Sequence, residues 1–188
     1  LNEGLKRCKY DIVARMDTDD YALENRFEKQ ISIFEKDKEM SVVGGLIQEY
    51  DIELKNKENI RNVPETDEEI KKFLKKRNAI NHMAVMYKKN DVINAGSYLD
   101  CPYFEDYYLW CRMAINNCKF HNVQDIIVNV RAGSEMINRR GGKKYFKPII
   151  NFYKKIKKIG FINTFECIYN CTLRIIVAMI PNSFRTKF

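Results

Sequence analysis

Apolar residues spaced for strands alternate with apolar residues spaced for helices along most of this chain, and that alternation limits the folds it can adopt. Strand-type runs occur at residues 10–17 (YDIVARMD) and 41–51 (SVVGGLIQEYD). Between them, Phe27, Ile31 and Phe34 recur at the spacing of one helix face. Strands that alternate with helices build a helix-covered sheet and not a β-sandwich. The sequence therefore predicts an α/β fold.

The same patterns predict the elements that follow. Residues 66–76 and 105–117 carry apolar side chains at helical spacing, and we expect a short helix and a packed helix there. Residues 119–123 and 125–133 are expected to form two separate short strands. The polar segment 51–64 is expected to be a loop.

The net charge of +8 is confined to the end of the chain. Residues 1–142 carry 23 Lys and Arg against 24 Asp and Glu, whereas residues 143–188 carry 10 against 1. Proteins that bind nucleic acid spread basic residues over the folded face that meets the phosphates. A neutral body with a basic tail therefore predicts no nucleic-acid partner, and it favours an anionic surface such as a membrane headgroup layer.

Residues 143–188 form a basic tail with helical patterning. Its first part, FKPIINFYKKIKKIGF, is amphipathic, and its second part, INTFECIYNCTLRIIVAMIP, is apolar but interrupted by Glu166 and Arg174. This pattern favours helices that lie in a membrane interface; a helical pair packed on the body and a membrane-spanning helix stay open as alternatives. The first residues, LNEGLKRCKYD, lack the features of a signal peptide. We therefore expect a cytoplasmic protein that is peripheral on the inner face of the cell membrane.

An acidic cluster, Asp17-Thr18-Asp19-Asp20, follows the first strand-type run. Carboxylates two residues apart at the end of a strand can turn toward one divalent cation and leave positions open for phosphate oxygens. The carboxyl ends of strands are also where α/β sheets bind ligands. The alternative is an Asp run that caps the following helix. A calcium-binding loop is excluded, because Ala22 stands at the position that requires glycine.

A second acidic pair, Glu105-Asp106, stands at the start of the helix expected over residues 105–117. Two adjacent carboxylates beside aromatic residues can supply a general base and a residue that orients it. The alternative is that they favour the helix start through the helix dipole.

Taken in order, the motifs resemble family 2 of the inverting glycosyltransferases, which act in bacterial capsule, O-antigen and exopolysaccharide synthesis. The matching motifs are LNEGL, DIVARMDTDD, RFEKQISIFEK, SVVGG, NAINHMAVMYKK, AGSY, FEDYYLWCRM and NRRGG. The resemblance covers residues 1–142 and implies a GT-A-like (Rossmann-like) mixed sheet flanked by helices. Residues 1–142 would then be the catalytic domain, and residues 143–188 a separate basic helical tail.

The resemblance also implies roles for the two acidic motifs. Asp17 and Asp19 match the family's DxD motif, which holds Mn²⁺ or Mg²⁺ on the diphosphate of a nucleotide-sugar donor, here expected to be a UDP-sugar. Asp20 belongs to the same turn and is expected to help bind the donor. Asp106 matches the general base that deprotonates the acceptor hydroxyl, with Glu105 beside it.

Three further residues match positions near the donor in this family. Arg139 and Arg140 stand on a glycine-flanked loop that is expected to close over the donor phosphates, and His82 matches a position near the donor or acceptor pocket. The alternatives are a solvated turn or part of the basic tail for the two arginines, and a structural histidine for His82.

Family members carry a strand and a helix ahead of the LNEGL segment, and these grip the nucleotide base and ribose. We therefore expect a sheet that is incomplete at its N-terminus, as in the C-terminal portion of a catalytic domain. The reaction implied is inverting transfer of a sugar to a saccharide or lipid-linked acceptor. The alternative is an inactive truncated fragment, or a non-catalytic membrane-associated remnant, of such an enzyme.

Overall fold

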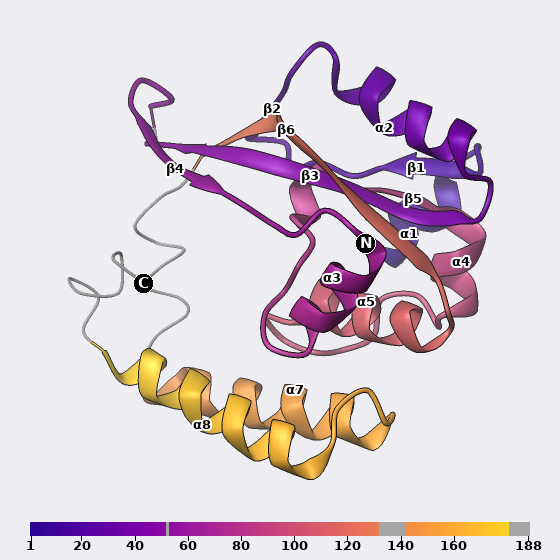
Figure 1. The fold of residues 1–188 in the computed structure, drawn as a ribbon. Coiled ribbons are helices and arrows are strands. Elements are labelled where there is room, and N and C mark those ends of the chain that lie inside the picture. The colour runs from indigo at the N-terminus through magenta and orange to yellow at the C-terminus, as the bar shows by residue number, and fades with distance from the viewer. Residues whose placement is uncertain (52, 132–141, 181–188) are drawn as a thin grey trace.

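The computed structural model describes residues 1–51, 53–131 and 142–180, and within them a curled sheet carries helices on both faces (Figure 1). The strands are β1 (Ile12–Ala14), β2 (Tyr21–Ala22), β3 (Met40–Tyr50), β4 (Lys57–Arg61), β5 (Met86–Lys88) and β6 (Lys119–Arg131). The helices are α1 (Asn2–Arg7), α2 (Arg26–Lys36), α3 (Asp67–Leu74), α4 (Lys89–Asn94), α5 (Glu105–Ile115), α7 (Phe146–Lys158) and α8 (Thr164–Met179), with short 3-10 turns η1 (His82–Ala84) and η2 (Lys143–Tyr145).

The sheet is mixed, as the sequence predicts. Its strand order is β1-β5-β3-β6-β2, with β4 paired to β3 beside that path. The long strands β3 and β6 run parallel, whereas the other pairs are antiparallel. The two outer strands of this order, β1 and β2, are consecutive in the sequence, and the segment that connects them contains the acidic turn of residues 17–20.

Alternate residues of β3 build two cores on opposite faces of the sheet. Val42 packs in the main core with α3, α5 and α7, and Val43 packs under α2 with Phe34 and Met86. Both valines are fully buried. Side chains of a strand point alternately to opposite faces, so this two-sided burial explains why β3 reads as a nearly continuous apolar run.

The glycine pair in β3 leaves space for side chains of β6. A Cβ added at Gly44 would lie 2.1 Å from Oδ1 of Asn122, and one added at Gly45 would lie 2.5 Å from Cδ1 of Ile127. The pairing of β3 with β6 also shifts register between Gly45 and Leu46. Glycine suits both positions because side chains of β6 occupy the space that a Cβ would take.

Two expectations for the strands were wrong. Residues 57–61, expected as loop, form β4, which pairs antiparallel with β3 through backbone hydrogen bonds and carries mostly exposed side chains. Residues 119–131, expected as two strands, form the single strand β6, because β3 pairs along its whole length and register shifts absorb the irregularities. Neither β4 nor the continuity of β6 can be recognised from alternating apolar and polar residues in the sequence.

The two C-terminal helices pack on the body as an antiparallel pair (Figure 1). The apolar face of α7 is buried in the main core, where Phe152 stacks on Phe104 with ring centres 4.7 Å apart. An Asn163–Glu166 capping box begins α8, which lies along α7. Among the residues described, none of the helices combines the length and apolarity needed to span a bilayer.

Candidate active site

The acidic turn lies directly beyond the end of β1. The backbone N–H of Asp20 donates to the carbonyl oxygen of Asp17 at 3.3 Å and closes the turn. Beyond it, Tyr21 pairs with Asn129 of β6 and returns the chain to the sheet. Pairing on both sides therefore fixes the turn, and Asp19 is exposed at its tip.

Asp17 is oriented by an arginine that the motifs did not single out. The guanidinium of Arg15 donates to both carboxylate oxygens of Asp17, at 3.0 and 2.6 Å. A bidentate pair of this kind fixes the plane of the carboxylate as well as its position. Each carboxylate oxygen accepts more than one hydrogen bond, so Asp17 keeps lone pairs for a further ligand.

A buried polar pair from α2 anchors the end of β1. Arg26, which is 1% exposed, donates to the carbonyl oxygen of Arg15 at 2.8 Å and to Oε1 of Gln30 at 3.0 Å. Gln30 in turn donates to the carbonyl oxygens of Val43 and Ala84, at 2.7 and 2.9 Å. Burial lowers the pKa of Arg26 to about 10, and the positive charge of Arg15 adds to this effect. The pair therefore ties α2, β1, β3 and η1 together behind the acidic turn.

Sequence reasoning missed this anchor, although the sequence contains a sign of it. Arg26 and Gln30 precede Phe34 at successive intervals of four residues, so all three share one face of α2. Phe34 is buried in the core under α2, and a polar residue on that same face must find buried partners.

Asp20 is the acidic residue most altered by its surroundings. Its Oδ1 accepts the backbone N–H of Arg131 at 3.2 Å, and its Oδ2 is buried without a hydrogen-bond partner among the described residues. Burial raises the pKa of Asp20 to about 6; the negative charges of Asp17 and Asp19 raise it further, and the Arg131 amide opposes them. A carboxylate in this situation gains from a cation placed beside it.

The turn offers oxygen donors suited to a hard divalent cation such as Mg²⁺ or Mn²⁺. Asp17, Asp19 and Asp20 supply three carboxylates, of which the orphaned Oδ2 of Asp20 is the clearest unmet acceptor. Within the described ranges, no three acidic, histidine or cysteine side chains already converge as a closed metal site. The donor set therefore fits a cation that takes its remaining ligands from water or phosphate.

His82 lies beside the same turn, in η1. Its Nε2 is 3.0 Å from the hydroxyl oxygen of Tyr98, and the Trp110 ring packs edge-on at 6.1 Å. Burial lowers the pKa of His82 to about 3; the charge of Arg15 lowers it further, whereas that of Asp17 raises it. His82 is therefore neutral at physiological pH and acts as a hydrogen-bonding group.

Tyr98 connects His82 to the second acidic motif. Burial raises the pKa of Tyr98, and the nearby charges of Tyr87 and Asp106 contribute to the increase. Its backbone is held by Asn2 of α1, which accepts from the Tyr98 N–H at 3.0 Å and donates to its carbonyl oxygen at 2.8 Å. The hydroxyl of Tyr98 therefore contacts His82, and Tyr98 also responds to the charge of Asp106.

Asp106 occupies the first turn of α5, with Glu105 half-buried beside it. Its Oδ2 accepts from Nδ2 of Asn78 at 2.8 Å, and its Oδ1 accepts the backbone N–H of Tyr107 at 2.7 Å. The contact with Tyr107 is local to the helix start, whereas Asn78 comes from the segment after α3. Asn78 therefore orients the Asp106 carboxylate, and the motifs did not identify it.

The structure places the residues singled out from the sequence on three segments. Asp17, Asp19 and Asp20 share the acidic turn after β1, His82 lies in η1, and Glu105 and Asp106 share the first turn of α5. His82 responds to the charge of Asp17, and its partner Tyr98 responds to that of Asp106. Arg139 and Arg140 lie outside the described residues.

Comparison with known proteins identifies the sequence family. Residues 1–92 match the family described as Glycosyl transferase family 2. The amylovoran biosynthesis glycosyltransferase AmsE of Erwinia amylovora is 42% identical over 165 residues, covering 86% of this chain and 61% of that protein. An uncharacterized glycosyltransferase of Haemophilus influenzae is 38% identical over 187 residues, covering 100% of this chain and 69% of that protein.

A third relative carries a more specific name. The UDP-Gal:alpha-D-GlcNAc-diphosphoundecaprenol beta-1,3-galactosyltransferase of Escherichia coli is 34% identical over 185 residues, covering 98% of this chain and 67% of that protein. The chain therefore spans between 61% and 69% of the length of these three relatives.

A solved structure supports the fold. The crystal structure of S. aureus TarS 1-349 matches with a TM-score of 0.52 at 13% identity, covering 97% of this chain and 50% of that one. The GT-A-like mixed sheet flanked by helices that the sequence predicts is confirmed.

Proposed function

The chain belongs to glycosyl transferase family 2, and on that basis we propose that it contributes a sugar-transfer site used in bacterial surface polysaccharide synthesis. The reaction proposed is transfer of a sugar from a nucleotide-sugar donor, a UDP-sugar, with inversion at the anomeric carbon. The observation that carries the proposal is that both acidic motifs hold an oriented carboxylate: Arg15 donates to both oxygens of Asp17, and Asn78 donates to Asp106. An inverting transfer needs a cation site and a base close together, and this arrangement supplies candidates for both.

Asp106 is the proposed general base. Inverting transfer is a single in-line displacement, so it needs a group that takes the acceptor proton but no covalent nucleophile. The Asn78 amide occupies one side of the carboxylate at 2.8 Å and fixes its orientation. Orientation matters because a base acts only within hydrogen-bond reach of the hydroxyl. Glu105 is the proposed neighbour that helps to bind the acceptor.

Asp17 and Asp19 are the proposed cation ligands, with Asp20 assisting on the donor side. A bound Mn²⁺ or Mg²⁺ would neutralise charge on the leaving diphosphate. The raised pKa of Asp20 and its orphaned oxygen support this role, because cation binding relieves both. Arg15 holds Asp17 in place, and Arg26 holds the Arg15 backbone.

The donor-side residues stand in two groups. His82 is proposed to hydrogen-bond the donor as a neutral imidazole, since its lowered pKa excludes a positive charge at neutral pH. Arg139 and Arg140 are proposed, from the sequence alone, to bind the donor phosphates. Hydrogen-bonding groups that are already oriented toward the charge developing on the leaving phosphate make one of the largest contributions to catalysis.

The proposed acceptor is a saccharide or a lipid-linked saccharide. The name of the E. coli relative specifies a UDP-Gal donor and a diphosphoundecaprenol-linked acceptor for that protein. A lipid-linked acceptor would bring the enzyme to a membrane, and we propose a peripheral position on the inner face of the cell membrane. The basic residues of 143–188 support this placement.

Calorimetric titration of UDP with Mn²⁺ tests the proposed donor site in the 188-residue chain. We expect metal-dependent binding that Asp17→Asn/Asp19→Asn abolishes. The control Asp11→Asn/Asp100→Asn removes two charges from exposed carboxylates elsewhere and should bind as the unmodified chain does. Equal metal-dependent binding by both double variants would contradict the assignment, and so would binding that is independent of the metal.

A further inference from the structure

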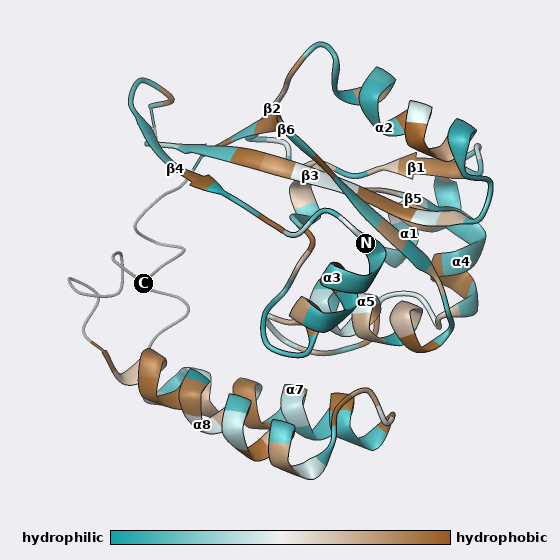
Figure 2. Cartoon of the chain, viewed as in Figure 1, coloured by the Kyte–Doolittle hydropathy of each residue, from teal (hydrophilic) through white to brown (hydrophobic). Residues whose placement is uncertain are grey.

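The outer face of α8 is an unusual surface for a folded domain. Six large apolar side chains on this helix are between 48% and 77% exposed, and we call them the α8 stripe: Phe165, Ile168, Tyr169, Leu173, Ile176 and Met179. Their spacing of three or four residues places them on one side of the helix. The opposite side packs on the body through Asn170 and Ala178, which are buried. Figure 2 shows that hydrophobic residues recur along α8.

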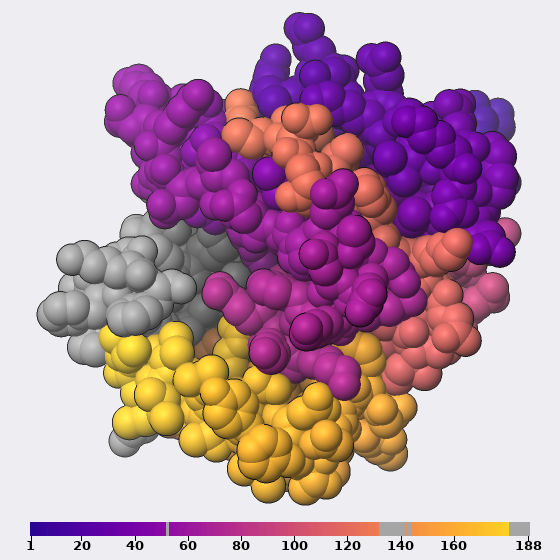
Figure 3. Space-filling view, in the orientation of Figure 1, coloured from indigo at the N-terminus to yellow at the C-terminus, as the bar shows by residue number. Residues whose placement is uncertain are grey.

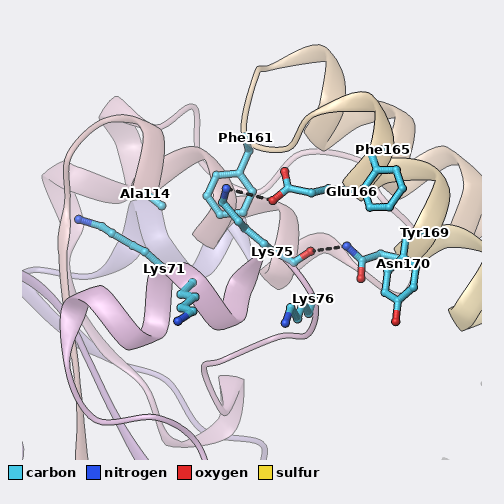
Figure 4. Close-up of a pocket in the computed structure, with 10 residues that line it drawn as sticks. Lys71, Lys75, Lys76, Ala114, Phe161, Phe165, Glu166, Tyr169 and Asn170 are labelled. Carbon is cyan, nitrogen blue, oxygen red and sulfur yellow. Dashed lines mark hydrogen bonds and ion pairs between the residues drawn. The ribbon is translucent and has the colours of Figure 1, made fainter.

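A lysine-lined groove joins the stripe. The groove has a volume of about 650 Å³ and lies between α3 and the first turns of α8 (Figure 4). Phe165 and Tyr169 line it together with four lysines in and directly after α3, which are Lys71, Lys72, Lys75 and Lys76. A second hollow runs along α8 from Phe165 to Ile176, so apolar and basic surfaces are continuous.

The lysines of the groove differ in how they are neutralised. Lys71 pairs with Asp67 at 2.8 Å and Lys75 pairs with Glu166 at 3.2 Å. Lys72 and Lys76 are exposed, and neither has an ion pair among the residues described. On the adjacent helix α7, Lys154, Lys157 and Lys158 are also exposed. Glu166 is the single acidic residue of segment 142–180, so this segment keeps a net positive charge. In Figure 3 the C-terminal helices, in orange and yellow, form the lower part of the visible face.

The combination of apolar and basic side chains decides which kind of partner can bind this surface. Two copies joined by a twofold axis would place this same patch against itself, which brings lysines against lysines. A nucleic acid would satisfy the lysines but leave the aliphatic side chains without a partner. An anionic bilayer satisfies both, because headgroup phosphates meet the lysines while the apolar side chains enter the acyl boundary.

We propose that the α8 stripe and the lysine groove beside α3 form one docking surface for an anionic lipid bilayer, with α8 lying in the plane of the interface. The proposal deepens the membrane partner proposed above: it names the surface, and it assigns α7 to the folded body and not to the bilayer. With 16 residues, α8 is about 24 Å long, shorter than the roughly 30 Å of a hydrocarbon core. A helix of that length can dock flat while its inner side stays packed on α7.

Co-sedimentation with vesicles tests this surface on the 188-residue chain at physiological salt. We expect binding to vesicles of equal parts phosphatidylglycerol and phosphatidylcholine, and none to phosphatidylcholine alone. Each lysine near an anionic surface contributes about fivefold in affinity. Lys72→Gln/Lys76→Gln should therefore weaken binding by roughly 25-fold, and Ile168→Ser/Leu173→Ser should weaken it at least as much.

Matched controls lie on α2 and just after it, across the sheet from α8 (Figure 1). Lys36→Gln/Lys38→Gln removes two exposed lysines, and Phe27→Ser removes one exposed apolar side chain. Both should bind vesicles as the unmodified chain does. Equal losses in Lys36→Gln/Lys38→Gln and Lys72→Gln/Lys76→Gln would overturn the proposal, because net charge alone would then account for binding.

Two further measurements distinguish the bilayer from a second copy of the chain, and the docking surface from the donor site. A dimer in sedimentation velocity that Ile168→Ser/Leu173→Ser converts to a monomer would overturn the proposal in favour of a second copy. The Asp17→Asn/Asp19→Asn variant should bind vesicles normally, while the Lys72→Gln/Lys76→Gln variant should bind Mn²⁺ and UDP normally. Failure of the donor site and failure of the docking surface therefore give different results.

Discussion

Replacing Gly44 by alanine tests whether the Asn122 side chain of β6 needs the space beside this glycine. The added Cβ would lie 2.1 Å from Oδ1 of Asn122 and 3.3 Å from its Cγ, so the asparagine side chain has to move. Asn122 is fully buried, and its Nδ2 donates to the carbonyl oxygens of Pro64 and Ala79 at 2.6 and 3.0 Å. Moving the amide breaks these two bonds and leaves two carbonyl groups without their partner.

The cost follows from those two carbonyl groups. A buried acceptor left without a partner costs about 1–3 kcal/mol, and alanine in a strand recovers about 0.5–1 kcal/mol relative to glycine. With two such acceptors, Gly44→Ala should therefore lower the free energy of unfolding by about 1–5 kcal/mol. For a chain of this length, that corresponds to a melting temperature lowered by about 2–20 °C.

Thermal and urea unfolding of a double-mutant cycle measure the effect. Asn122→Ala removes the same two bonds, so Gly44→Ala/Asn122→Ala should cost little more than Asn122→Ala alone. Gly4→Ala is the matched control, because a Cβ at Gly4 meets nothing within 4 Å and α1 gains a better helix former. If the losses of the two single variants add up in the double variant, the added Cβ does not act through Asn122 and the reasoning is refuted. A loss below about 1 kcal/mol for Gly44→Ala would refute it as well.

Three other substitutions have distinct expected outcomes. Thr66→Ala removes the capping box that begins α3 and should lower the free energy of unfolding by about 1 kcal/mol, measured by urea titration. The fold keeps His82 neutral, so the stability that it contributes is complete above pH 6.5 and is lost as the pH falls toward 3. Between pH 7.5 and pH 4.5, the melting temperature of His82→Gln should therefore fall less than that of the unmodified chain. Asp106→Asn should keep metal-dependent UDP binding in calorimetry but lose sugar transfer in any assay that detects it, and transfer retained by this variant would exclude Asp106 as the base.

The sequence predicted elements well where local chemistry decides them. The apolar spacing of residues 66–76, of α2 and of α5 located three helices, and the first of them begins with a Thr66–Glu69 capping box. The strand β4 escaped prediction, because its backbone pairs with β3 while its side chains are exposed. Tertiary pairing of this kind leaves no periodic trace in the sequence.

The candidate site was predictable in its acidic residues but not in the groups that hold them. Asp17 and Asp106 stand in recognisable motifs, whereas Arg15, Arg26 and Asn78 act through contacts that only the fold creates. Asn78 lies 28 positions before Asp106 in the chain, and no spacing rule connects the two. Supporting residues of this type are found from the structure because their role depends on hydrogen-bond partners distant in sequence.

The acidic turn joins the two outermost strands of the sheet, and this has a consequence for the order of folding. The turn is anchored on one side by β1 with β5 and on the other by Tyr21 with Asn129 of β6, so both long-range pairings must form before its carboxylates are in place. Contacts between residues far apart in sequence form late, because long loops must close first. A growing polypeptide on the ribosome would therefore form the acidic turn, the proposed cation site, only after β6 has been synthesised. A cation bound at this turn would also slow the local opening of both edges of the sheet. Amide hydrogen exchange at Val13 and Tyr21 would then become slower.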